Sequence, residues 1–120
     1  MATLSKPIVI VEDDPDIRDA IHALLTEEGY TVVVAPNCLE AQAVLRSLEN
    51  PCIVLLDLRT SLLHGEQAMH ELRRTLAAHS VPVIVATTVL EWSARLEAQV
   101  VLKKPFRVDA LLKAVEAHCG

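Results

Sequence analysis

Glycine is scarce in this sequence, with only three among 120 residues: Gly29, Gly65 and Gly120. Phosphate loops that bind nucleotides need several closely spaced glycines, as in G-x-G-x-x-G or the P-loop. Three glycines so far apart cannot supply either motif. The sequence therefore excludes the usual dinucleotide and nucleotide phosphate loops.

Long apolar runs and clusters of basic residues are missing as well. Hydrophobic residues make up 52% of the chain, but no apolar run approaches the roughly 18 residues that a membrane helix needs. The 11 basic residues are scattered and the formal net charge is −5, whereas a nucleic-acid backbone is bound by clustered Lys and Arg. We therefore expect no membrane span and no direct nucleic-acid binding.

Cysteines are few and widely spaced, at Cys38, Cys52 and Cys119, and no two of them form a C-x-x-C pair. An odd number at such spacing fits reduced thiols, buried as small apolar side chains, better than a disulfide framework or a zinc site. The first residues, MATLSKP, lack the apolar core and cleavage site of a signal peptide. We therefore expect a cytoplasmic protein with reduced thiols.

Five short apolar runs, rich in Val and Ile, are spread along the chain. They cover residues 8–11, 31–35, 52–56, 81–86 and 100–102. Runs of this length are typical of strands in a parallel sheet that is buried on both faces. Segments with apolar residues at helical spacing lie between them. We expect one domain, residues 1–120, because a chain of this length forms a single core.

The alternation of strand and helix, five times over, defines the expected fold class. Right-handed crossovers then give an α/β, doubly wound, five-stranded parallel sheet with helices on both faces. Helix-capping residues agree: Asp14 precedes Pro15, Asn37 precedes the second helix and Gly29 follows the first. The crossover at residues 89–98 is close to the shortest possible, so we expect a shortened fourth helix, of two turns or fewer, around residues 91–98.

Polar side chains stand where the predicted strands end, which is where doubly wound sheets bind ligands. Glu12 and Asp13 follow the first strand, Asp57 the third, Thr87 the fourth and Lys104 the fifth. Carboxylates held together repel one another, and a hard divalent cation such as Mg²⁺ relieves this repulsion. The cation would also neutralise charge for an incoming phosphoryl group. The ammonium and the hydroxyl could then contact the phosphoryl oxygens.

Helix capping is the simpler explanation of an acid after a strand. It accounts for Asp14, which is followed by Pro15 at the first helical position. It does not account for Asp57, because residues 58–64 separate this carboxylate from the next predicted helix. Asp57 is therefore the leading candidate for a chemical role.

Four motifs carry a resemblance to a known family. The segments VEDDPDIR, VLLDLR with Gly65 beyond it, PVIVATT and KKPF resemble, in order and approximate spacing, the receiver domains of bacterial response regulators. The resemblance covers nearly the whole chain and implies the (βα)5, flavodoxin-like fold of chemotaxis regulators. It implies that Asp57 is the phosphoacceptor and that Glu12, Asp13 and the carbonyl of Arg59 hold Mg²⁺ with it, directly or through water.

The same resemblance implies how such a domain would signal. Thr87 would be the switch hydroxyl and Lys104 the cation that pairs with the phosphoryl group. The phosphoryl donor would be a sensor histidine kinase or a phosphotransfer protein, and the output a downstream protein target or a homodimer. Receiver domains are not enzymes in the ordinary sense, since each promotes only its own phosphorylation and dephosphorylation.

The sequence departs from the family pattern around the site. Ser61 stands where a Pro is usual, His64 where an acid is frequent, Thr88 where Ala is usual and Val101 where the family has an aromatic switch residue. None of these changes removes a group needed for phosphorylation. They concern how the signal is passed on.

Two other classes of protein deserve comparison. Haloacid-dehalogenase-like hydrolases also use an aspartate nucleophile with Mg²⁺, but they need a second Asp two residues later, where this chain has Arg59. Degenerate receivers act as interaction modules without phosphorylation, but they usually lose the acidic pair, the phosphoacceptor or the Lys. This chain keeps them all, and phosphorylation by acetyl phosphate with and without Mg²⁺ separates the three hypotheses.

Overall fold

The computed structural model describes residues 7–48, 51–57, 65–87, 100–103 and 107–119. Its helices and strands alternate along the chain. In order they are β1 (Ile8–Val11), α1 (Pro15–Glu27), β2 (Val32–Ala35), α2 (Cys38–Ser47), β3 (Ile53–Asp57), α4 (Gly65–Ala78), β4 (Val83–Thr87), β5 (Val100–Lys103) and α6 (Val108–Cys119).

The five strands form one sheet in the order β2-β1-β3-β4-β5, and every neighbouring pair is parallel. The strand order reverses between β1 and β3, as it does in a doubly wound sheet. The predicted α/β class and five-stranded parallel sheet are thus confirmed. The shortened fourth helix that we expect at residues 91–98 lies outside the described residues.

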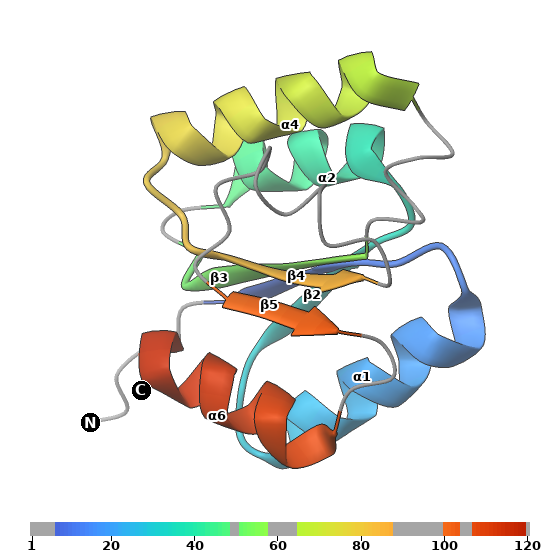
Figure 1. The fold of residues 1–120 in the computed structure, drawn as a ribbon, viewed down its shortest axis with the longest axis vertical. Helices are drawn as coiled ribbons and strands as arrows, with labels where there is room; N and C mark the ends of the chain where they lie inside the picture. Colours follow the sequence, from blue (N-terminus) through green and yellow to red (C-terminus); the bar gives the residue numbers. More distant parts are fainter. Residues whose placement is uncertain (1–6, 49–50, 58–64, 88–99, 104–106, 120) are drawn as a thin grey trace.

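Helices cover both faces of the sheet: α2 and α4 lie on one face and α1 and α6 on the other (Figure 1). Successive side chains of a strand point to opposite faces, so each central strand contributes to two cores. On β1, Val9 and Val11 pack with the core beneath α2 and α4, whereas Ile8 and Ile10 pack with the core beneath α1 and α6. All four are fully or almost fully buried, as expected of a central parallel strand.

The predicted helix caps are confirmed by their hydrogen bonds. The side chain of Asp14 accepts from the backbone N–H groups of Asp16 and Ile17, and Pro15 is the first residue of α1. The side chain of Asn37 accepts from the N–H of Glu40 at 2.8 Å. These caps fix where the chain leaves β1 and β2.

The end of α1 is also as predicted. Gly29 has a φ of 95°, a left-handed conformation that costs glycine little. Its N–H donates to the carbonyl of Thr26, and the N–H of Tyr30 donates to that of Leu25. This pair of hydrogen bonds is the Schellman arrangement, which ends the helix and turns the chain toward β2.

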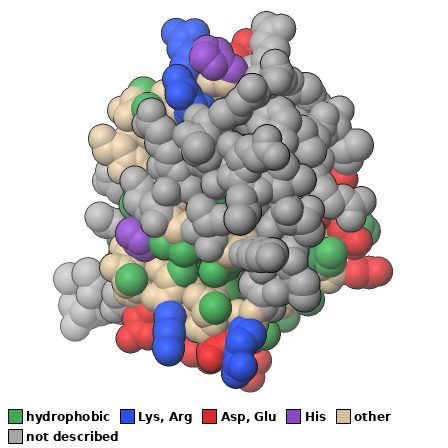
Figure 2. All heavy atoms as spheres, viewed as in Figure 1, with side chains coloured by type: hydrophobic (Ala, Val, Ile, Leu, Met, Phe, Trp, Pro, Cys, Tyr) green, Lys and Arg blue, Asp and Glu red, His purple; other side chains and the backbone are tan. Residues whose placement is uncertain are grey.

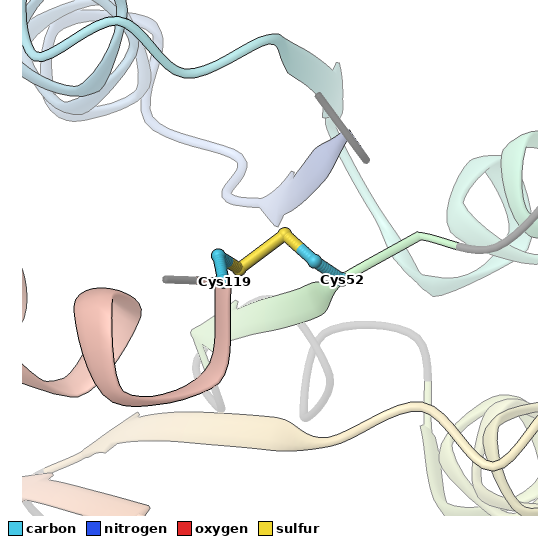
Figure 3. Close-up of a disulfide and its surroundings, with 2 residues drawn as sticks. All are labelled: Cys52 and Cys119. Atoms are coloured by element: carbon cyan, nitrogen blue, oxygen red, sulfur yellow. A yellow bond between two sulfur atoms is a disulfide. The ribbon is translucent and has the colours of Figure 1, made fainter. Parts of the chain in front are cut away.

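The cysteines require a correction. Cys52 and Cys119 form a disulfide, whereas we predicted reduced thiols (Figure 3). They are 67 positions apart in sequence, yet their Cα atoms are 5.4 Å apart. Cys52 lies just before β3 and Cys119 ends α6, a helix that runs back toward the strand starts. The fold therefore brings together two residues whose sequence spacing gives no sign of contact.

Cys38 is a buried thiol outside the disulfide, as the sequence predicts. This residue begins α2, is completely buried in the core beneath α2 and α4 and is not part of the disulfide. It packs as a small apolar side chain.

The disulfide predicts a redox-dependent stability. Because the bond closes a loop with a sequence separation of 67, its reduction should lower the free energy of unfolding by about 4 kcal/mol, through the greater chain entropy of the unfolded state. Urea unfolding with and without dithiothreitol measures this difference. A variant with both Cys52→Ala and Cys119→Ala is the control and should unfold identically in the two buffers. A wild-type transition that does not respond to reductant would contradict the expectation.

Candidate functional site

The parallel register aligns the carboxyl ends of the central strands. Val11, the last residue of β1, is opposite Leu56. The next residues are Glu12, just after β1, and Asp57, the last residue of β3. Asp57 is opposite Ala86 on β4, and the following residue, Thr87, is opposite Lys103 on β5. Four neighbouring strands therefore end at one edge of the sheet, next to the point where the strand order reverses.

The structure places most of the predicted site residues at this edge. Glu12 directly follows β1, and Asp57 and Thr87 are the last residues of β3 and β4. Lys103 ends β5, so Lys104 is the next residue of the chain. Lys104 itself and Arg59 lie outside the described residues.

Glu12 is held in place at this edge. Its side chain is only 4% exposed, and its Oε1 accepts a hydrogen bond of 3.1 Å from the N–H of Asp14. Its own N–H donates to the carbonyl of Ala35 on β2 at 3.0 Å. A carboxylate removed from water is costly unless polar or charged groups compensate it. A buried carboxylate at the end of a central strand is expected of a site that binds a cation or another charged group.

Asp13 and Asp14, the next two acidic residues, differ in their structural roles. Asp14 is exposed and occupied by the helix cap, which confirms its structural assignment. Asp13 is partly exposed and is not engaged as a cap of α1. Figure 2 shows acidic side chains on the side of the molecule where β1 leads into α1. The structure thus places Glu12 and Asp13, the predicted acidic pair, directly after β1.

The predicted metal ligands extend beyond what the structure describes. Within its described part, no three acidic, histidine or cysteine side chains lie close enough to hold a metal ion. The predicted set also needs the carboxylate of Asp57 and the carbonyl of Arg59, which that part does not include. The carboxylate and carbonyl oxygens of the set are nevertheless the ligand type that Mg²⁺ prefers.

Arg18 is a contributor that the sequence reasoning missed. Its Nη1 donates to the backbone carbonyl of Glu12 at 3.4 Å. The sequence could have indicated this contact, because Arg18 lies four residues after the cap Asp14. The N–H of Arg18 donates to the Asp14 carbonyl in the first turn of α1. A long basic side chain in that turn can reach back to the strand end. Arg18 thus links the start of α1 to the acidic segment.

A doubly wound parallel sheet with an acidic carboxyl edge defines the class of protein, and comparison with known proteins gives the family. The sequence model of the response regulator receiver domain family matches residues 8–116 of this chain. The chain belongs to this family and is a receiver domain of two-component signalling.

Individual relatives agree. The protein PilH of Pseudomonas aeruginosa is 33% identical over 115 residues, which are 92% of this chain and 94% of PilH. The response regulator MprA of Mycobacterium ulcerans is 32% identical over 119 residues, 95% of this chain but 50% of MprA. The chain thus spans nearly all of one relative and about half of the other.

Solved structures show the same fold. A response regulator receiver protein from Burkholderia phymatum superposes with a TM-score of 0.78 at 29% identity, over 96% of this chain and 95% of that one. The receiver domain of the sensor histidine kinase PA1611 from Pseudomonas aeruginosa has a TM-score of 0.79 at 23% identity, over 97% and 98% of the two chains. That structure has a magnesium ion coordinated in its active-site cleft.

Membrane-spanning helices are absent from the described ranges of the chain. None of the helices in these ranges is long and apolar enough to cross a bilayer.

The contacts of Glu12 predict how two replacements differ. Glu12→Ala should lower the free energy of unfolding by about 1 kcal/mol, because the N–H of Asp14 loses its acceptor. Glu12→Gln should cost much less, since the amide oxygen can still accept that hydrogen bond. Chemical unfolding of both variants beside wild type measures the difference. Equal destabilisation by the two replacements would show that the charge, and not the hydrogen bond, holds this segment.

Proposed function

We propose that this receiver domain accepts a phosphoryl group on Asp57 in a Mg²⁺-dependent reaction and thereby switches its protein contacts. The observation that carries the proposal is the register, which ends β1, β3 and β4 at one edge with Glu12, Asp57 and Thr87 side by side. Membership of the receiver family supports the same roles for these positions.

The proposed reaction uses an oxygen of the Asp57 carboxylate as nucleophile. As the bond from this oxygen to phosphorus forms, the bond from phosphorus to the donor's histidine nitrogen breaks, and the product is an aspartyl phosphate. Positioning and charge stabilisation supply most of the catalysis in such transfers. Thr87 would donate its hydroxyl to a phosphoryl oxygen, and Lys104 would place its ammonium on another.

The acidic pair would hold the cation. Asp13, Asp57 and the carbonyl of Arg59 would be its ligands, with Glu12 acting through a bound water. Bound Mg²⁺ supplies neutralisation of the phosphoryl oxygens and of the clustered carboxylates. The oxygen-only donor set and the fixed, buried Glu12 fit this role, and the magnesium in the related PA1611 receiver domain supports it.

The proposed partners follow from the family. A sensor histidine kinase or a phosphotransfer protein would donate the phosphoryl group, and a downstream protein target or a second copy of the chain would read the phosphorylated form. We propose that this happens in the bacterial cytoplasm and without direct contact to nucleic acid, in keeping with the net charge of −5.

Phosphorylation itself is the first test. Acetyl phosphate with Mg²⁺ should add the mass of one phosphoryl group to the wild-type protein, and EDTA should abolish the addition. Asp57→Asn should gain none, whereas Asp19→Asn, which changes an exposed carboxylate of α1, should react like wild type. Intact-mass analysis reads all four samples. Labelling of Asp57→Asn to the wild-type extent would refute the assignment of the phosphoacceptor.

The path of the signal gives a second test. Val101 has no aromatic ring to reorient, so we propose that Thr87 and the segment 88–92 report phosphorylation, with Trp92 as the reporter. Trp92 is the only Trp of the chain and lies outside the described residues. Beryllofluoride with Mg²⁺, which mimics a phosphoryl group, should change the Trp fluorescence of wild type but not that of Thr87→Ala. The same change in both proteins would show that Thr87 does not carry the coupling.

A further inference from the structure

A cavity of about 460 Å³ lies between α2 and α4, on the face of the sheet that these helices cover. Its lining combines one buried amide with charged and polar side chains from both helices. The lining residues are Gln42 and Arg46 of α2, Glu71, Arg74, Thr75 and Ala78 of α4, and His79 just beyond it. A volume of this size suits a small molecule.

Gln42 is the unusual member of this lining. Its side chain is only 6% exposed, and its amide Nε2 finds no hydrogen-bond partner in the described part of the chain. A buried donor without an acceptor costs free energy, so proteins rarely leave one unless it serves another purpose. Gln42 also lines the cavity. Nε2 itself is covered, so a ligand there would supply the missing acceptor once the Gln42 side chain turns toward the cavity.

Two guanidinium groups reach the same cavity from opposite walls. Arg46 lies in the last turn of α2 and Arg74 on α4, and both side chains are exposed. Guanidinium groups present paired N–H donors that match the oxygens of carboxylates and phosphates. Figure 2 shows basic and histidine side chains together at the end of the molecule where α4 lies.

The α4 wall of the cavity is fixed by local hydrogen bonds. The hydroxyl of Thr75 donates to the carbonyl of Glu71 at 3.1 Å, and Nδ1 of His79 donates to the carbonyl of Thr75 at 2.8 Å. Glu71 is half-buried and engaged in an interaction of its own. Its charge offsets one of the two arginines, which leaves an excess of positive charge for a ligand.

We propose that this α2–α4 cavity is a binding site for the oxyanion group, phosphate or carboxylate, of a small molecule. Arg46 and Arg74 bind its oxygens from the two helices, and the Gln42 side chain turns so that its covered Nε2 donates to it. The site is separate from the phosphoacceptor edge. Arg74 and His79 lie near the end of α4, which leads into the start of β4, whereas Asp57 and Thr87 stand where strands end.

The test uses the whole protein in EDTA, so that metal-dependent binding near Asp57 cannot contribute. Sodium phosphate and sodium acetate are titrated separately into isotopically labelled protein at constant ionic strength. Two-dimensional NMR then follows the side-chain amide of Gln42 and the backbone amides of residues 71–79. Saturable shifts of these signals with one or both anions are expected, and the two titrations identify which oxyanion is preferred.

Matched variants make the assignment specific. Arg46→Gln with Arg74→Gln should weaken binding by at least about tenfold, because charged hydrogen bonds are lost. Arg107→Gln removes an exposed arginine that pairs with Asp109 on α6 and should bind like wild type. Gln42→Met keeps the side-chain volume but removes the unpaired donor. It should raise the thermal midpoint of the ligand-free protein and weaken anion binding.

The outcomes divide cleanly. Weakened binding in the double arginine variant and in Gln42→Met, with Arg107→Gln unchanged, supports the site. Shifts that do not saturate with either anion, or equal weakening in Arg107→Gln, would mean general screening of charge and would overturn it. A Gln42→Met variant that binds as wild type would show that Nε2 of Gln42 does not donate to the ligand and would overturn its role in the site.

Discussion

The parallel register of the central strands is the constraint on which the rest of this receiver domain depends. Pairing of Val11 with Leu56 and of Asp57 with Ala86 brings the acidic segment after β1, the proposed phosphoacceptor Asp57 and Thr87 to one edge. A slip of one residue would turn every side chain of a strand to the other face and break both cores. Burial of Val9 on one side and Ile10 on the other therefore fixes the register, and with it the residues that stand at the strand ends.

The two ends of the parallel strands differ in the residues that they carry. At the carboxyl edge, Asp14 caps α1, and its N–H donates to the side chain of Glu12. Short-range contacts therefore position these acidic residues. At the opposite edge, Cys52 is joined to Cys119 and ties α6 to the start of β3. The proposed site for a charged group therefore lies at one end of the strands, and the disulfide lies at the other.

Features that follow local rules could be predicted from the sequence, and features that depend on distant contacts could not. Asp14 and Gly29 were predicted because capping needs only the neighbouring residues, and the strand ends at Asp57 and Thr87 followed from apolar runs. The prediction of reduced thiols was wrong for Cys52 and Cys119, because their disulfide joins residues 67 positions apart. The burial of Gln42 was also beyond reach, since its place on α2 becomes unusual only when α4 packs beside it.

Paramagnetic broadening by Mn²⁺, in place of Mg²⁺, tests most directly whether the carboxyl edge is the cation site. Mn²⁺ has similar oxygen-ligand preferences and broadens NMR signals in its vicinity. At substoichiometric Mn²⁺, the account predicts that the backbone amides of Glu12, Asp13, Asp57 and Thr87 broaden first, and that Asp13→Asn weakens the effect. Broadening centred on the α2–α4 face or near Cys52, with the amides at the strand ends unaffected, would contradict it.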